Sequence, residues 1–503
     1  MRRIMYSLMV LATLVGCSRP EIVATQQGKI KGLISSDQVV RVFRGIPFAA
    51  PPTGDLRWRA PQPVTNWQGV KECLEFSASP IQNKPEPFLC WTEEFIAQPE
   101  PLSEDCLYLN VWTTAKAKAE KQPVFVWIYG GGFTSGSANC DIYDGEEMAR
   151  QGVVFVSINY RVGVMGFMAH PELSKEAEYG TSGNYGLLDQ VAALKWVREN
   201  IAAFGGDPEQ VTIAGQSAGS YSVNALITSP LAEGLFARAI LQSGGILSGR
   251  PIEDLTEAEN MGLDFMEKVG ATSLSDLRAM PAITLQQEKS VPFSIALDGH
   301  LLPKDVVGHY KNKRQHQVPI LAGWVTGDGT LFGPANTTAE DFRATTIDRY
   351  GERADKFLTT FPFATDEEAT AINLRMSMLS FAGVPAHRLA KYNSAPSYLY
   401  EFNHVPPEKE DFPDYGAFHT ADVPYALHTL HAWKRNWEEE DRSLEKVMSS
   451  YWVNFAKTGN PNGADLPEWK LYEAADGFIQ ELGDEVVSRP GLHRAAFDFL
   501  EEM

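Results

Sequence analysis

The sequence predicts an α/β fold in which a large, mainly parallel central sheet is flanked by helices. Apolar runs of strand length alternate with helical stretches along the 503 residues. β-Forming residues at 211–214 lead directly into the pattern G-x-S-x-G at 215–219, which is typical of a sharp turn from a strand into a helix. The hydrophobic content of 44% is enough to bury a large core.

The individual elements follow from these runs in chain order. The expected strands are Val124–Tyr129, Val153–Asn159, Val211–Ala214, Ala239–Gln242, Pro319–Gly323 and Tyr398–Phe402. Over Leu187–Ile201 apolar residues recur every three to four positions, which predicts a helix, and another helix is expected to begin at Ser217. Because no repeat, low-complexity tract or linker interrupts the pattern, we expect residues 17–503 to form one domain with loop insertions.

The N-terminus has the features of a bacterial targeting segment. Two arginines precede an apolar stretch at residues 4–16, which is too short to span a bilayer as a helix. Leu14–Cys17 resembles a lipobox, so we expect residues 1–16 to be a signal peptide and Cys17 to be lipidated. Ser18 favours sorting to the outer membrane, on its periplasmic or surface side, with the lipid as the only membrane contact. The alternative is an ordinary secretory signal and a secreted protein.

The charge of the chain excludes some partners. A net charge of −20 argues against nucleic acid, because polyanions bind to basic surfaces. The acidic side chains are scattered, apart from Glu438–Asp441, which is expected to form a solvated loop.

Four cysteines remain in the exported chain after Cys17 is set aside. They are Cys73, Cys90, Cys106 and Cys140. An even number in an exported protein suggests disulfide bonds, and of the three possible pairing schemes we prefer one that joins Cys90 to Cys106. No C-x-x-C spacing occurs, so no metal site is expected.

Ser217 is the candidate nucleophile. The glycines two positions to either side leave room for a strained backbone, and the following helix presents its positive end to developing negative charge. A serine hydroxyl needs a base and an orienting acid, which follow this kind of turn in the order acid and then histidine. His419, in the glycine-led loop Gly416–Asp422, and His404, nearer to the strand Tyr398–Phe402, are the two candidate bases.

Two aspartates compete for the role of the acid. Asp328 follows the strand Pro319–Gly323 and has a glycine on either side, which permits an unusual turn. Asp298 precedes the same strand and is the alternative.

An oxyanion site is expected from the glycine run that follows the strand Val124–Tyr129. Consecutive glycines let backbone N–H groups point into a site without interference from side chains. The N–H groups of Gly131, Gly132 and Ala218 are therefore candidates for a three-donor oxyanion hole. A phosphate-binding loop is disfavoured, because no Gly-Lys-Ser/Thr follows the glycines.

With these residues in place, nearly all of the exported chain resembles the type B carboxylesterase family, which includes cholinesterases and para-nitrobenzyl esterases. The matching segments are Phe43–Phe48, Pro51–Gly54, Arg57, Ser103–Trp112, Trp127–Phe133, Asn159–Gly163, Gly183–Gln190, Phe204–Pro208 and Tyr451–Gly459. The resemblance implies an α/β-hydrolase fold whose loop and helical insertions form a gorge above the catalytic serine.

Carried over by position, the resemblance selects one residue for each catalytic role. It implies Ser217 as nucleophile, Asp328 as acid and His419 as base, which favours these residues over Asp298 and His404. It implies Gly131, Gly132 and Ala218 as oxyanion donors. It also implies a structural ion pair between Arg57 and Glu104.

The chain departs from the family pattern at three positions. The acid is Asp328 where most members have the longer glutamate, so it must lie closer to the base. Gln216 replaces the usual glutamate before the nucleophile, and the lost charge weakens the case for a cationic substrate. Pro80 stands where many members have a cysteine that pairs with the counterpart of Cys106, and Cys90 is the candidate substitute.

These residues predict a serine hydrolase that cleaves a small-molecule carboxylic ester through an acyl-enzyme, without a cofactor. One alternative is a catalytically inactive binding or adhesion member of the same fold. Another is the same triad acting on an amide, carbamate or lactone. The aromatic residues that are candidates for the substrate pocket are Trp91, Phe133, Trp324, Phe332 and Phe418.

Overall fold

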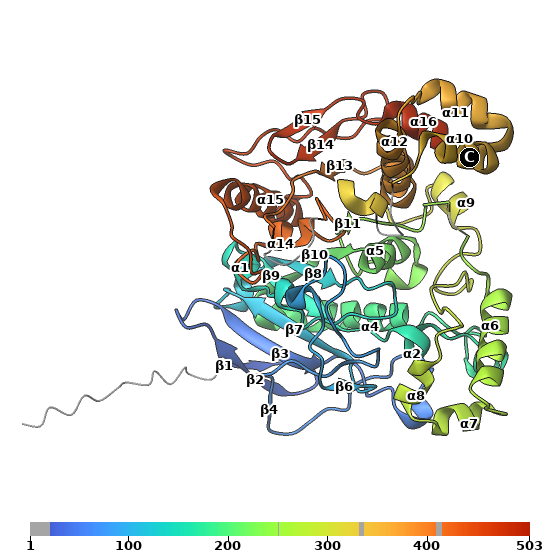
Figure 1. Cartoon of the computed structure of the whole chain (residues 1–503). Coiled ribbons are helices and arrows are strands. Elements are labelled where there is room, and N and C mark those ends of the chain that lie inside the picture. Colours follow the sequence, from blue (N-terminus) through green and yellow to red (C-terminus); the bar gives the residue numbers. More distant parts are fainter. Residues whose placement is uncertain (1–20, 250, 331–335, 409–414, 503) are drawn as a thin grey trace, which may run out of the picture.

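The structure is a computed structural model that describes residues 21–249, 251–330, 336–408 and 415–502 (Figure 1). The signal peptide at 1–16, Cys17 and Phe332 therefore lie outside the described residues. No helix in the described ranges is long and apolar enough to cross a membrane.

A long twisted sheet forms the centre of the molecule (Figure 1). The described strands are β1 (Glu21–Ala24), β2 (Lys29–Ile34), β3 (Arg41–Pro47), β4 (Val70–Glu72), β5 (Ser79–Pro80), β6 (Leu102–Ser103), β7 (Tyr108–Thr113), β8 (Gln122–Ile128), β9 (Val154–Ile158), β10 (Gly206–Gln216), β11 (Arg238–Gln242), β12 (Ile320–Val325), β13 (Ser397–Phe402), β14 (Ile479–Leu482) and β15 (Val486–Arg489). In the main sheet they are ordered β1-β2-β3-β7-β9-β8-β10-β11-β12-β13-β14-β15, with β4 beside β2, while β5 and β6 pair separately.

Strands β9 through β14 run parallel in the middle of the main sheet, and antiparallel strands extend it at both ends. The six expected strands are all present, as β8 to β13, with small shifts in their ends. The largest shift is at β10, where Gly206–Gln210 precede the apolar run, because Gly206 already pairs with Gln122 of β8. The prediction of a mainly parallel sheet is confirmed.

Helices cover both sides of the parallel strands. The described α-helices are α1 (Glu146–Arg150), α2 (Gly163–Phe167), α3 (Pro171–Glu176), α4 (Tyr185–Asn200), α5 (Ala218–Thr228), α6 (Leu255–Lys268), α7 (Leu274–Ala279), α8 (Ala282–Gln287), α9 (Val306–Lys311), α10 (Ala339–Tyr350), α11 (Ala354–Thr360), α12 (Asp366–Met378), α13 (Val384–Tyr392), α14 (Asp422–Leu427), α15 (Glu439–Thr458) and α16 (Arg494–Glu501). Figure 1 shows α5 on one side of β10 and α15 on the other, and both helices pack against this strand.

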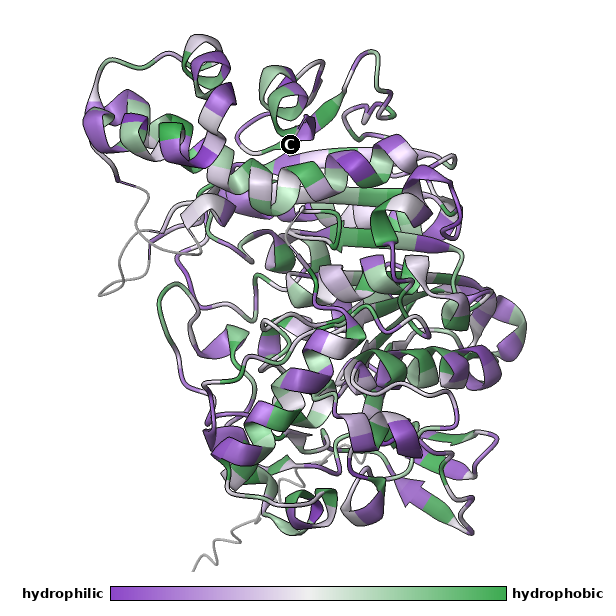
Figure 2. Cartoon of the chain, turned by 90° about the vertical axis from the view of Figure 1, so that its right-hand side faces the viewer, coloured by the Kyte–Doolittle hydropathy of each residue, from purple (hydrophilic) through white to green (hydrophobic). Residues whose placement is uncertain are grey.

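The two helices expected from the sequence are close to their predicted places. The stretch Leu187–Ile201 forms most of α4, and α5 begins one residue after Ser217. The strands of the sheet are mostly hydrophobic in Figure 2, whereas the outer helices carry many hydrophilic residues. Burial of these apolar strands between two helical layers stabilises the fold and holds the ends of the strands in fixed positions.

At Glu438–Asp441 the expectation of a loop is wrong, whereas Glu438, Glu439 and Glu440 are exposed to solvent as expected. Glu438 caps the N-terminus of α15, and the next three residues form the first turn of this helix. Carboxylates are favoured there because the exposed N–H groups carry partial positive charge. Asp441 is buried and accepts hydrogen bonds from His404 Nε2 at 2.7 Å and Tyr425 at 2.8 Å.

The expected disulfide bonds are absent from the described part of the chain, where all four cysteines are free and buried. A small cavity beside Cys106 is lined by Pro80, so a proline stands next to the thiol that was expected to pair. Burial raises the pKa of the Cys73, Cys90 and Cys140 thiols to about 12, and these thiols are therefore uncharged at neutral pH.

Candidate active site

Ser217 lies at the turn between β10 and α5, where the backbone adopts a strained conformation. Its φ of 55° and ψ of −123° are rarely found for a residue with a side chain. The flanking glycines allow the turn: a Cβ at Gly215 would lie 2.5 Å from Gly219, and one at Gly219 would lie 2.0 Å from the Ile128 carbonyl oxygen. The turn raises the serine hydroxyl above the sheet at the N-terminus of α5.

The neighbouring parallel strands bring the other candidate residues to the same edge of the sheet. Strand β8 leads into the glycine loop at 130–132, and β12 leads into the 3-10 helix η7 (Thr326–Thr330), which contains Asp328. His419 comes from the loop between β13 and α14. Carboxyl ends of adjacent parallel strands commonly form the site in such folds, and these residues follow that rule.

His419 and Asp328 form a short, buried pair. The distance from His419 Nδ1 to Asp328 Oδ1 is 2.5 Å, and the two side chains are 5% and 0% exposed. The other oxygen of Asp328 accepts a hydrogen bond from the Val325 N–H at 3.2 Å, which fixes the carboxylate relative to the end of β12. Asp328, although its side chain is shorter than that of glutamate, thus reaches the His419 imidazole from the first turn of η7.

The competing residues are held in other places. His404 Nε2 is bound to Asp441, as described above. Asp298 Oδ1 accepts hydrogen bonds from the backbone N–H groups of His300, Leu301 and Leu302, so this carboxylate closes a turn. Neither side chain is among the residues that line the cavity above Ser217.

The glycine loop after β8 has the geometry of an anion-binding turn. Gly131 and Gly132 have φ values of 118° and 62°, and the Gly131 carbonyl oxygen accepts the N–H groups of Thr134 and Ser135. Within the described residues, the N–H groups of Gly131 and Gly132 donate to no protein acceptor. Ala218 is the first residue of α5, so its N–H has no partner one turn earlier in the helix. All three residues line the cavity next to Ser217.

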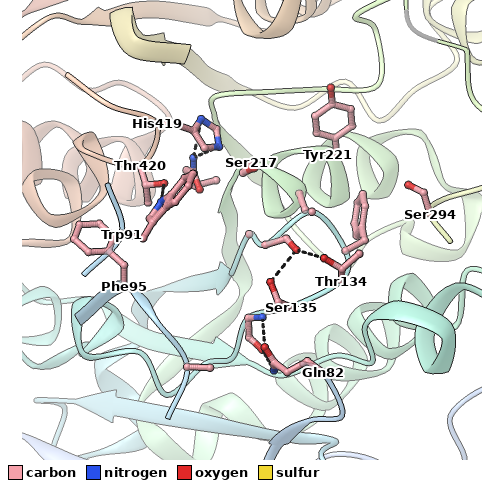
Figure 3. Close-up of a pocket in the computed structure, with 18 of the residues that line it drawn as sticks. Gln82, Trp91, Phe95, Thr134, Ser135, Ser217, Tyr221, Ser294, His419 and Thr420 are labelled. Carbon is pink, nitrogen blue, oxygen red and sulfur yellow. Dashed lines mark hydrogen bonds between the residues drawn. The ribbon is translucent and has the colours of Figure 1, made fainter. Parts of the chain in front are cut away.

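A gorge of about 810 Å³ opens above these residues. In Figure 3, Trp91, Phe95 and Thr420 lie to one side of Ser217, and Tyr221 and Ser294 lie to the other. Trp91 Nε1 donates to Thr420 Oγ1 at 2.9 Å, and the Trp91 ring meets the His419 ring edge-on at 6.3 Å between centroids. A segment far away in the sequence therefore supports the loop that carries the histidine.

Of the aromatic residues expected to line the pocket, Trp91 and Phe133 do so. Trp324 and Phe418 do not line the gorge and are wrong as predictions. Trp324 is fully buried and donates to Glu401 at 2.8 Å, and Phe418 packs against Phe95 and Trp433. Phe418 directly precedes His419, and Trp324 lies four residues before Asp328, so closeness in sequence to candidate residues was misleading.

Sequence reasoning missed a buried carboxylate behind the histidine. Asp422 Oδ2 accepts hydrogen bonds from Tyr400 at 2.6 Å and Gln242 at 2.9 Å. Burial raises the pKa of Asp422 to about 6, and the charge of Asp328 acts in the same direction. The sequence offered one signal for this carboxylate: Asp422 follows His419 by only three residues.

The expected ion pair between Arg57 and Glu104 is present. Two guanidinium nitrogens lie 2.6 Å from the two carboxylate oxygens, and a third donates to the carbonyl oxygens of Leu277, Arg278 and Met280. The pair connects the N-terminal region to the segment around α7.

Comparison with known proteins assigns the family. Residues 19–500 match the sequence model described as "Carboxylesterase family". Fumonisin B1 esterase from Sphingopyxis macrogoltabida is 36% identical over 496 residues, which cover 93% of this chain and 87% of that protein. Liver carboxylesterase 1 from Oryctolagus cuniculus is 33% identical over 538 residues, covering 94% and 92% of the two chains.

Para-nitrobenzyl esterase from Bacillus subtilis (strain 168) is 33% identical over 474 residues, covering 90% of this chain and 92% of that protein. A solved structure of PNB esterase superimposes with a TM-score of 0.81 at 30% sequence identity, covering 95% of this chain and 99% of the other. The chain therefore belongs to the carboxylesterase family and is a serine hydrolase of carboxylic esters.

Proposed function

We propose that Ser217, His419 and Asp328 form the catalytic triad and that the reaction passes through an acyl-enzyme. The observation that carries this proposal is the 2.5 Å contact between His419 and Asp328, in which His419 lines the same gorge as Ser217, a serine held in a strained turn. Asp328 holds His419 with its proton on Nδ1, which leaves Nε2 to accept a proton.

In the proposed reaction, Ser217 Oγ attacks the ester carbonyl carbon while His419 takes the hydroxyl proton. The negative charge that develops on the carbonyl oxygen is stabilised by the N–H groups of Gly131, Gly132 and Ala218. His419 then protonates the leaving alcohol. In the second half, His419 takes a proton from water as the water oxygen attacks the acyl-enzyme carbonyl carbon, and it then gives that proton to Ser217 Oγ as the bond to the acyl group breaks, which releases the acid and free Ser217.

Substitution Ser217→Ala tests the nucleophile. We expect the variant to lose hydrolysis of p-nitrophenyl butyrate and labelling by a fluorophosphonate, while its circular dichroism spectrum stays that of the wild type. In the wild type we expect one fluorophosphonate label per chain, and mass spectrometry should locate it on Ser217. Substantial hydrolysis by the variant would overturn the assignment.

We propose that the substrates are esters with a bulky apolar portion. The gorge volume lies in the range of pockets that hold drug-sized ligands. Phe88 and Leu89, which are 55% and 58% exposed, lie at the gorge together with Trp91, and the Phe88 and Trp91 rings are 4.8 Å apart. An apolar surface thus extends from the exposed part of the gorge toward Ser217.

A panel of p-nitrophenyl and aryl-alkyl esters tests this substrate class. We expect kcat/KM to rise with apolar acyl or alcohol size from acetate upwards, and an ester with a free carboxylate on its acyl chain to react more slowly. A matched anilide should react far more slowly than the ester, because the amide carbonyl is less electrophilic. Preference for acetate or for the anilide would contradict the proposal.

We further propose that the protein is a lipoprotein held at a membrane by Cys17. Support comes from the lipobox-like Leu14–Cys17, which ends an apolar stretch behind two arginines. Expression of the full chain in a bacterium that lipidates such proteins, followed by mass spectrometry of the N-terminal peptide, tests this. We expect a diacylglyceryl adduct in the wild type and a soluble esterase from Cys17→Ser. An unmodified wild-type cysteine would overturn the proposal.

A further inference from the structure

Gln82, a buried residue from a distant part of the chain, is bonded to the end of the glycine loop. It lies in the segment that follows β5, whereas the loop follows β8. Its side-chain oxygen accepts a hydrogen bond from the Gly136 N–H at 2.9 Å, and its amide nitrogen donates to the Gly136 carbonyl oxygen at 2.9 Å. Because one bond needs an acceptor and the other a donor, the orientation of the amide is fixed.

The Gln82 side chain is itself held in place. It is 1% exposed, and its amide nitrogen also donates to the Pro80 carbonyl oxygen of β5 at 3.1 Å. Strand β5 is paired with β6. Figure 3 shows Gln82 beyond Thr134 and Ser135 as seen from Ser217. Gln82 thus connects the short sheet of β5 and β6 to the far end of the glycine loop.

Gly136 in turn packs against the peptide that carries the Gly131 N–H. A Cβ at Gly136 would lie 2.5 Å from the Gly130 carbonyl oxygen, and the φ of 110° at Gly136 is in the region that favours glycine. The Gly130 carbonyl and the Gly131 N–H belong to one planar peptide unit, so a contact on the oxygen limits the direction of the N–H. The position of Gly136 therefore influences the aim of the first candidate oxyanion donor.

The peptide that carries the Gly132 N–H is held by the same segment. Its oxygen is that of Gly131, which accepts from the Thr134 and Ser135 N–H groups at 3.0 and 3.1 Å and from both hydroxyls at 3.2 Å. Residues 134–136 thus support both glycine donors, and Gln82 holds the last of these residues.

On the basis of the triad and the oxyanion site proposed above, we propose that Gln82 is a positioning residue for the oxyanion donors. Its two bonds to Gly136 keep residues 134–136 against the peptides of Gly131 and Gly132. Both N–H groups then point to the place where the carbonyl oxygen gains negative charge. Donors that are oriented in advance stabilise the transition state without having to turn during the reaction.

Gln82→Met tests this role, because methionine has a similar length and forms neither bond. We expect kcat for p-nitrophenyl butyrate to fall by about 10–100-fold while KM changes by less than about threefold. This loss is smaller than the roughly 10²–10³-fold loss for removal of an oxyanion donor, because both donors remain and only aim less well.

A pair of inhibitors separates this role from a general loss of structure. Ser217 Oγ adds to the carbonyl carbon of an aryl trifluoromethyl ketone, its proton passes to His419, and the ketone oxygen becomes an oxyanion among the donors. The matched secondary alcohol forms no such adduct. In Gln82→Met we expect the Ki of the ketone to rise by the factor by which kcat/KM falls, because both report stabilisation of the oxyanion. The Ki of the alcohol should stay that of the wild type.

Gln315→Met is the matched control. Gln315 is 4% exposed and donates to the Tyr392 carbonyl oxygen at 3.1 Å, and it is not among the residues that line the gorge. In urea denaturation this variant should lose stability, as Gln82→Met does, while it keeps the wild-type kcat and both wild-type Ki values.

A wild-type kcat in Gln82→Met, or a lower kcat with an unchanged Ki of the ketone, would overturn the inference. If that variant does not fold, the same two measurements on Gln82→Asn decide, because its amide is one methylene short of Gly136. Fluorophosphonate labelling of Ser217 in the wild type shows separately whether the nucleophile proposal holds. A labelled wild type together with unaffected Gln82 variants overturns the role of Gln82 alone.

Discussion

At the scale of single residues, backbone hydrogen bonds on both sides of Ser217 hold this residue in its strained conformation. The Ser217 N–H donates to the Gln242 carbonyl oxygen at 2.9 Å, and the Ser217 carbonyl oxygen accepts from Tyr221 at 2.9 Å. These bonds maintain a conformation that costs about 1–3 kcal/mol in isolation. The surrounding structure thus keeps the hydroxyl in one place before any substrate arrives.

Replacing Asp328 by asparagine tests the orientation of the base. Asparagine offers an N–H to His419 Nδ1 in one orientation and so stabilises the wrong tautomer. We expect kcat for p-nitrophenyl butyrate to fall by about 10³–10⁴-fold with a small change in KM. Asp298→Asn is the control and should keep wild-type kcat, because that carboxylate closes a turn and does not line the gorge. A loss under tenfold in Asp328→Asn would argue against Asp328 as the acid.

Asp422 links stability to pH. Burial raises its pKa from 3.8 to about 6, so the folded state binds the proton more tightly than the unfolded state. Its contribution to stability is therefore fully present below pH 3.8 and is lost as the pH rises through 6. Asparagine does not titrate. We expect the free energy of unfolding of Asp422→Asn, relative to wild type, to rise by about 2 kcal/mol between pH 4 and pH 7.

Urea denaturation at the two pH values measures this difference. Asp298→Asn again serves as the control. A difference between Asp422→Asn and wild type that is the same at pH 4 and pH 7 would mean that the carboxyl group titrates normally.

At the scale of elements, the strand ends and the loops that follow them determine the site. The loop after β8 uses two glycines in different ways. A Cβ at Gly131 would lie 2.3 Å from the Ser135 carbonyl oxygen, whereas the nearest atom to a Cβ at Gly132 is 3.8 Å away. The φ of 118° at Gly131 is suited to glycine alone, and the 62° at Gly132 is in the left-handed region that alanine adopts at modest cost.

These positions predict unequal effects of the same substitution. We expect Gly131→Ala to lower kcat by about 10²–10³-fold, because moving the loop misaims oxyanion donors, and Gly132→Ala to lower it much less. Steady-state kinetics with p-nitrophenyl butyrate measures both. Equal losses in the two variants would indicate that the crowding at Gly131 does not control the donors.

At the scale of the whole molecule, buried ion pairs connect segments far apart in the sequence. The Arg57 and Glu104 side chains are 7% and 16% exposed, and Arg57 also binds three carbonyl oxygens around the end of α7. Removing one partner leaves the other charge buried without compensation. We expect Arg57→Met to lower the free energy of unfolding by about 3–5 kcal/mol while kcat per labelled active site is retained.

Urea denaturation with fluorophosphonate titration of active sites measures both quantities. Lys268→Met is the control, because its ion pair with Asp264 is exposed and should contribute under about 1 kcal/mol. Equal stability of Arg57→Met and wild type would show that the pair does not join these segments. A lower kcat per titrated active site in Arg57→Met would show that this ion pair also affects the catalytic site.

Local sequence determined the strands, the main helices and the sharp turn at Ser217. Apolar runs predict the parallel strands because a strand buried on both faces must be hydrophobic throughout. The glycines around Ser217 predict the sharp turn because no other residue fits there. At Glu438–Asp441 the charges correctly indicated solvent exposure of the three glutamates, but they did not reveal the start of a helix or the burial of Asp441 against the distant His404.

Tertiary structure alone decided which distant groups meet. Spacing in the sequence left both His404 and His419 as candidates for the base. In the structure the two rings have different partners: His404 is bonded to Asp441, and His419 is bonded to Asp328. The amide of Gln82 at the glycine loop and the buried carboxyl of Asp422 were likewise beyond local sequence. The reason is that strand order and loop paths set these contacts, and hydrogen-bond geometry and burial depend on positions in space that no local pattern specifies.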